Sequence, residues 1–72
     1  MSKASVKAEI DSKKAYVAAK RAEVALWRSR KSASKDKSYK AYCDGNIRMK
    51  QSDIANRMAE IARLRERLKY EK

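Results

Sequence analysis

The large apolar residues of the C-terminal half recur at intervals of seven. The stripe that they form consists of Ile47, Ile54, Ile61 and Leu68, with Met58 and Leu64 beside them. Apolar residues at this spacing lie along one side of an α-helix, as they do in the seam of a coiled coil. The pattern predicts a helix over residues 47–70 that packs this stripe against a partner.

The N-terminal half carries a second stripe, with steps of four, seven, seven and three residues. Its members are Val6, Ile10, Val17, Val24 and Trp27. This spacing predicts a helix from about residue 4 to residue 28, with Ser2 or Ser5 as the N-cap. Val6 to Trp27 spans the same number of residues as Ile47 to Leu68, so each stripe is about 32 Å long.

The composition favours helices and disfavours sheets, since proline and phenylalanine are absent and much of the 43% hydrophobic content is alanine. The sequence Cys-Asp-Gly-Asn predicts a turn over residues 43–46, in which Gly45 takes a positive φ and Asn46 caps the next helix. We therefore expect an all-α fold, an antiparallel two-helix hairpin that forms a single domain over residues 1–72.

The middle of the chain, residues 29–42, is rich in serine and basic residues. Between Arg28 and Ser38 the single apolar residue is Ala33. Two arrangements fit this segment. In one, Ser34 helps to break the helix, a short extra helix forms between the long ones, and the two stripes align directly. In the other, the first helix continues to Tyr42 and a second subunit covers the ends of the stripes.

A chain of this size gains little stability from its own core, because a domain of about 60 residues buries only about 60% of its unfolded surface. One cysteine and no histidine leave no intrachain disulfide and no zinc ligand set. A small apolar face on the first helix would allow close approach of another helix; it comprises Ala8, Ala15, Ala19, Ala22 and Leu26. The sequence therefore predicts a homodimer that forms a helical bundle.

Charge points to the class of partner. Twenty Lys and Arg against nine Asp and Glu give a net charge of +11, and such a basic domain is typical of nucleic-acid-binding proteins. The excess is greatest between residues 13 and 40, where phosphates would neutralise it. The candidate phosphate contacts are Lys13, Lys14, Lys20, Arg21, Arg28, Arg30, Lys31, Lys35, Lys37 and Lys40. We expect binding to DNA or RNA without sequence preference.

Three aromatic residues lie within or next to this basic region. Trp27 extends the valine stripe, while Tyr39 and Tyr42 flank Lys40. They either close the end of the hairpin over Ile47 or stack on unpaired bases. Both roles are open at this stage.

Nothing in the sequence predicts an enzyme. There is no histidine for acid–base chemistry and no glycine-rich phosphate loop, and Cys43 is expected to be an incidental thiol in the predicted turn. We expect no cofactor and no metal. No apolar run is long enough for a signal peptide or a membrane span, and a lone thiol suits a reducing compartment, so the expected location is the cytoplasm.

A protein partner is the alternative to nucleic acid. The chain would then be a small accessory regulator or inhibitor, of the kind that phages and plasmids encode to bind a host protein. Its basic face would contact an acidic protein surface, and its alanine face and Trp27 would supply further contacts.

Overall fold

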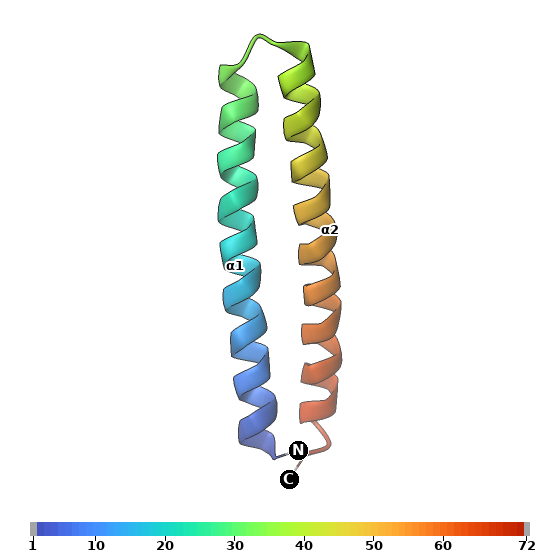
Figure 1. Ribbon diagram of the computed structural model, residues 1–72. Coiled ribbons are helices and arrows are strands. Elements are labelled where there is room, and N and C mark those ends of the chain that lie inside the picture. The colour runs from blue at the N-terminus through green and yellow to red at the C-terminus, as the bar shows by residue number, and fades with distance from the viewer. Residues whose placement is uncertain (1, 72) are drawn as a thin grey trace.

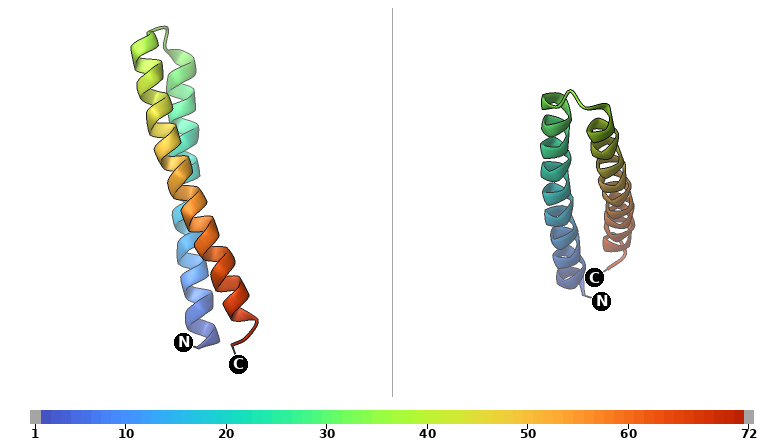
Figure 2. Two further views of the ribbon diagram at one scale, coloured as in Figure 1. Left: turned by 90° about the vertical axis from the view of Figure 1, so that its right-hand side faces the viewer. Right: turned by 45° about the horizontal axis from the view of Figure 1, so that its top comes forward.

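The protein is a hairpin of two long helices that pack antiparallel (Figure 1). The computed structural model describes residues 2–71. Helix α1 runs from Lys3 to Ala33 and helix α2 from Lys37 to Leu68, with residues 34–36 as the loop between them. The views in Figure 2 show a narrow rod with the loop at one end and both termini at the other. The predicted all-α antiparallel hairpin is confirmed.

The core is the seam between the two helices, where the two apolar stripes meet. Val6, Ile10 and Val17 of α1 form a buried cluster with Ile61 of α2. Burying a side chain of this size stabilises a fold by about 1.5–3 kcal/mol, so these contacts are what hold the helices together. Further along the rod, towards the loop, the buried seam residues are Val24, Cys43 and Ile47. Of the two arrangements that the sequence left open, the one in which the stripes align directly is therefore the one observed.

The chain reverses at Ser34 and Asp36. Ser34 is the extended C-cap of α1, and its hydroxyl accepts a hydrogen bond from the Asp36 backbone N–H at 3.1 Å. Asp36 is the N-cap of α2, and its carboxylate accepts one from the backbone N–H of Ser38 at 2.9 Å. These short polar side chains bind the backbone groups that a continuous helix would have paired. The helix therefore breaks at residues 34–36, and the alternative of a long helix to Tyr42 is wrong.

The turn predicted over residues 43–46 is also wrong. Gly45 lies inside α2, and no residue within 2–71 has a positive φ. Asn46 continues the helix, and its side chain donates to the carbonyl oxygen of Tyr42 at 3.0 Å. Glycine inside a helix costs only about 1 kcal/mol, and a continuous α2 keeps both Cys43 and Ile47 buried in the seam. Cys43 is thus a buried helical residue rather than a loop thiol.

The helix limits change accordingly. Helix α2 begins at Lys37, ten residues before the predicted 47, and ends at Leu68. It absorbs the short extra helix that one arrangement placed between the long ones. Helix α1 is capped by Ser2, one of the two predicted N-caps, whose hydroxyl accepts a hydrogen bond from the Ser5 N–H at 3.2 Å. It ends at Ala33, five residues beyond the predicted 28. Within residues 2–71, neither helix combines the length and the apolar character that crossing a bilayer requires.

Candidate nucleic-acid interface

The fold separates the basic residues of α1 into two rows. Residues seven apart share one side of a helix, so Lys14, Arg21 and Arg28 form a row on one flank of the seam. Lys13 and Lys20 fall on the seam itself, in register with the buried valines. The two rows meet different surroundings in α2.

The seam row is neutralised within the chain. Lys13 Nζ lies 2.6 Å from Glu60 Oε2, on the opposite helix. Lys20 Nζ lies 3.3 Å from Glu23 Oε2, which is also 3.4 Å from the Nζ of Lys50. Of the ten candidate phosphate contacts, Lys13 and Lys20 are therefore matched by carboxylates on this side of the hairpin.

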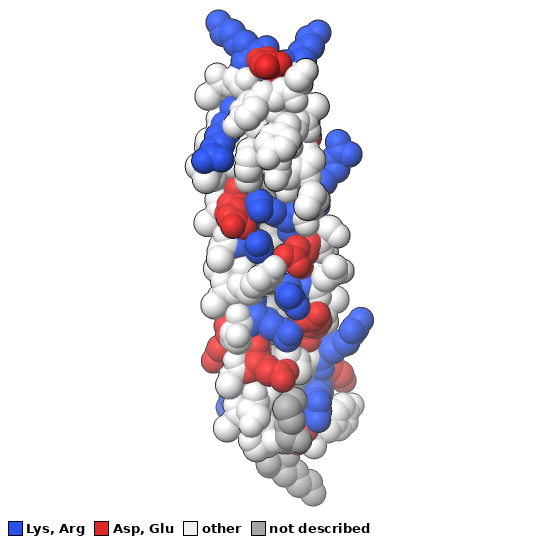
Figure 3. Space-filling model, in the orientation of Figure 1, with Lys and Arg blue, Asp and Glu red and all other residues white. Residues whose placement is uncertain are grey.

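Figure 3 shows this side, which we call the paired face: acidic and basic side chains alternate along the line between the helices. Its polar contacts continue with Tyr16, whose hydroxyl donates to the carboxylate of Asp53. Arg57 pairs with Glu60 at 3.2 Å and lies over the Tyr16 ring, 4.7 Å from its centroid. The hydrogen bonds from Lys13 and Arg57 hold the pKa of Glu60 below its ordinary value of 4.5. This face has its charges largely satisfied.

The opposite flank of the seam is a basic groove. It is formed by three adjoining hollows, of which the first and second share Arg28 and Gln51 and the second and third share Arg21. Its basic residues are Lys14, Arg21, Arg28, Lys31, Lys40, Arg48 and Arg65. Asp44 is the one acid among the lining residues. The groove follows the rod along most of its length.

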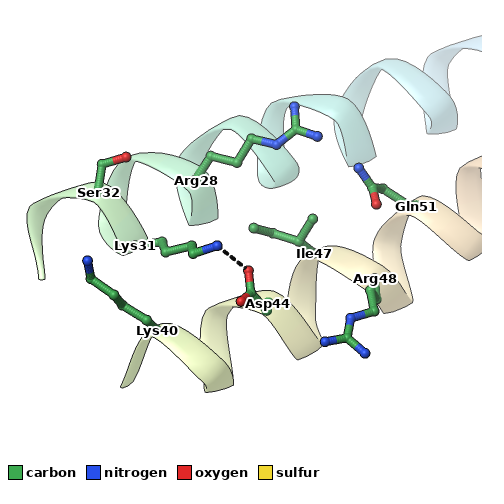
Figure 4. A pocket seen from close by; sticks show the side chains of 8 residues that line it. All are labelled: Arg28, Lys31, Ser32, Lys40, Asp44, Ile47, Arg48 and Gln51. Atoms are coloured by element: carbon green, nitrogen blue, oxygen red, sulfur yellow. Dashed lines mark ion pairs between the residues drawn. The ribbon is translucent and has the colours of Figure 1, made fainter. Parts of the chain in front are cut away.

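Figure 4 shows the part of the basic groove nearest the loop. Lys31 reaches across to Asp44, with 2.7 Å between Nζ and Oδ1. Arg28 and Arg48 come from opposite helices, with Ile47 between them in this view. Within residues 2–71, neither arginine forms an ion pair, and Lys40 forms none either.

The structure divides the ten sequence candidates into three groups. Three are paired with carboxylates: Lys13, Lys20 and Lys31. Four line the basic groove with no ion pair to a described residue: Lys14, Arg21, Arg28 and Lys40. Arg30, Lys35 and Lys37 lie at or beside the loop, and they too make no ion pair with residues 2–71.

Two basic groove residues were missed by the sequence argument, which stopped at residue 40. They are Arg48 and Arg65 of α2. The signal was present, because Arg48 follows Ile47 by one residue and Arg65 follows Ile61 by four. Such positions flank an apolar stripe on a helix.

The three aromatic candidates come together near the loop. The ring centroids of Trp27 and Tyr42 are 5.6 Å apart with the planes at 76°, and those of Tyr39 and Tyr42 are 6.2 Å apart. The guanidinium carbon of Arg30 lies 4.9 Å from the centroid of the Trp27 ring. Loss of hydration, together with the neighbouring Cys43, raises the pKa of Tyr39 above its ordinary value. Tyr42 is 59% exposed.

Comparison with protein-family models, with curated proteins and with solved structures found no match to this chain.

Proposed function

We propose that this protein binds nucleic acid without sequence preference, through phosphates that lie along the basic groove. The observation that supports the proposal is the division of charge between the two flanks of the seam. The carboxylates of Glu23, Asp53 and Glu60 are engaged on the paired face. The basic groove, with seven Lys and Arg to one Asp, keeps its positive charge.

A polyanion relieves the repulsion within the basic groove. Lys14, Arg21 and Arg28 follow one another at about 10.5 Å along α1, and Arg48 and Arg65 face them from α2. Arginine can bind a phosphate with two parallel hydrogen bonds. Each phosphate that is neutralised releases condensed counterions, which drives binding at low salt. Phosphate contacts carry no direct sequence information, so the complex has no preferred sequence.

The proposal is tested by a titration of a labelled oligonucleotide at about 50 mM salt, followed by fluorescence anisotropy. The variant Arg21→Gln/Arg28→Gln removes two basic groove charges. The matched control Lys3→Gln/Arg63→Gln removes two exposed charges outside the groove. We expect the groove variant alone to bind more weakly. The slope of log K against log salt concentration should become shallower by about 1.5. Absence of binding by the unchanged protein, or equal loss in both variants, refutes the proposal.

A protein partner is the second candidate, and it is favoured by the outward side of α1. Leu26 is 49% exposed there, among the exposed alanines Ala15, Ala19 and Ala22. Small residues let another helix approach closely.

The partner on this side is a second copy of the chain, giving the bundle dimer, or a target protein that the chain would regulate or inhibit. Light scattering after nuclease treatment, on the protein and on Leu26→Glu, separates a dimer from a monomer. A stoichiometric protein retained after nuclease treatment and lost in Leu26→Glu supports the target.

A further inference from the structure

We propose that the loop end of the hairpin binds an unpaired strand, with a base stacked on the ring of Tyr42. Arg30, Lys35 and Lys37 hold the phosphates on either side of that base. This inference rests on the proposed function, and it specifies the ligand as single-stranded DNA or RNA rather than a duplex.

Tyr42 is the most exposed member of the aromatic cluster near the loop. Cys43 is fully buried, and Trp27 and Tyr39 are half-buried around this end of the seam. Packing at the end of the core accounts for these three residues. Tyr42 contacts the same cluster yet keeps more than half of its surface in solvent. The cluster therefore fixes the orientation of a ring that still presents surface to a ligand.

The geometry of the cluster leaves room on that ring. The 76° angle between Trp27 and Tyr42 is an edge-to-face contact, and the Tyr39 centroid is 6.2 Å away at a tilt of 34°. Neither neighbour is stacked in parallel on Tyr42. An aromatic side chain in this situation can accept a base of any type, because every base has a π-face. The lack of sequence preference in the proposed function is thus retained.

Three cations lie at the same end of the hairpin as the exposed ring. Arg30 is held against Trp27, which itself touches Tyr42. Lys35 lies in the loop and Lys37 opens α2, and the carboxylate between them belongs to Asp36, which caps the helix. In Figure 3, basic side chains project from the loop end on both sides of an acidic one. The loop end can therefore bind phosphates while a base lies on Tyr42.

This combination discriminates between strand types. In a duplex, the faces of the bases are covered by their neighbours, so an aromatic side chain gains nothing from them and phosphate contacts alone remain. An unpaired strand can give both a base face to Tyr42 and phosphates to the lysines. Stacking on an aromatic residue is a large enough contribution to decide between the two.

The test uses Trp27, which is the sole tryptophan and touches Tyr42. Its emission is followed while the whole protein is titrated with oligothymidylate or oligouridylate of about 15 nucleotides, and with a duplex of equal length. We expect either single strand, or both, to shift the emission and to bind about tenfold more tightly than the duplex. Tyr42→Leu should remove that preference and Tyr42→Phe should keep it. Tyr70→Leu is the control, since Tyr70 is 78% exposed at the other end of the rod.

The two proposals fail in different ways. If single strands and duplex bind equally and Tyr42→Leu changes nothing, while Arg21→Gln/Arg28→Gln still weakens binding, the present inference is overturned and the proposed function stands. Unchanged Trp27 emission at saturation also overturns it. If no oligonucleotide binds at low salt, both proposals are refuted. The variant Lys35→Gln/Lys37→Gln is a second test of the loop site, because it should weaken single-strand binding while leaving the aromatic cluster unchanged.

Discussion

Lys31 Nζ lies 2.7 Å from Asp44 Oδ1, in an ion pair that crosses from α1 to α2 near the loop (Figure 4). Asp44 is the one acid among the residues that line the basic groove. The pair is about 40% exposed on both sides, so it is screened by solvent and adds little to stability. Its main consequence is electrostatic, because it removes one cation from the surface that we assign to phosphates.

The variant Asp44→Asn should therefore tighten nucleic-acid binding. It releases Lys31 and removes the negative charge, so one further phosphate can be neutralised and the salt slope should steepen by about 0.7–0.9. Anisotropy titrations at several salt concentrations measure both effects. The matched control is Glu66→Gln, which releases Lys69 from a 3.2 Å pair outside the basic groove. Equal tightening in the two variants would show that net charge, not the groove, is responsible.

A second prediction concerns Gly45. It lies in the interior of α2 with a negative φ, and a Cβ added there would have no atom within 4 Å apart from its two chain neighbours and the nearby backbone of α2 itself. Gly45→Ala should therefore raise the free energy of unfolding by about 0.5–1 kcal/mol, since alanine loses less backbone entropy. Urea unfolding followed by circular dichroism measures the change. The exposed Ala41 of the same helix gives the reverse control, because Ala41→Gly should destabilise by a similar amount. A loss of stability in Gly45→Ala would instead indicate a turn with positive φ.

Gly45 also shows where sequence reasoning reached its limit. Glycine followed by asparagine has the local chemistry of a turn, and local chemistry was the basis of the prediction. The position of the reversal is decided by a non-local requirement, which is that Cys43 and Ile47 of α2 remain in the seam opposite α1. The equal lengths of the two apolar stripes did indicate that the stripes lie side by side. The arrangement with a break near Ser34, which was based on these lengths, was the correct one.

The candidate site was predictable to a similar degree. The seven-residue spacing of Lys14, Arg21 and Arg28 places these three residues in one row on α1, and this row can be read from the sequence. The spacing could not show which row is neutralised, because the carboxylate that pairs with Lys13 is Glu60, 47 residues away. Glu60 also pairs with Arg57, three residues before it on α2.

The contacts of Glu60 lead to a third prediction, on pH. Its pKa is lowered in the folded protein by Lys13 first and Arg57 second. A carboxyl group whose pKa is lower in the folded than in the unfolded protein stabilises the fold at pH values above its unfolded pKa. That contribution is lost as the pH falls through the folded pKa. The free energy of unfolding should thus fall as the solution is acidified from neutral to below 4.5.

Glu60→Gln separates this contribution from the rest. The variant should be less stable at neutral pH and should lose less stability on acidification, since it lacks the titrating group. Urea unfolding at neutral pH and at about pH 3 measures both differences. The control is Glu9→Gln, whose carboxylate forms no ion pair with residues 2–71. A pH dependence identical in Glu60→Gln and the unchanged protein would contradict the prediction.

A fourth prediction uses Asp36, which both caps α2 and carries the negative charge of the loop. Asp36→Ala removes the acceptor for the Ser38 N–H, so we expect a loss of about 1 kcal/mol in the free energy of unfolding. Asp36→Ser keeps a capping oxygen and should retain most of that stability.

Both variants remove the same charge between Lys35 and Lys37, so both should bind single-stranded oligonucleotides more tightly at low salt. Thermal unfolding and anisotropy titrations together separate the two roles. Equal stability of Asp36→Ala and Asp36→Ser would show that the cap contributes nothing, and unchanged affinity in both would place the bound phosphates away from the loop.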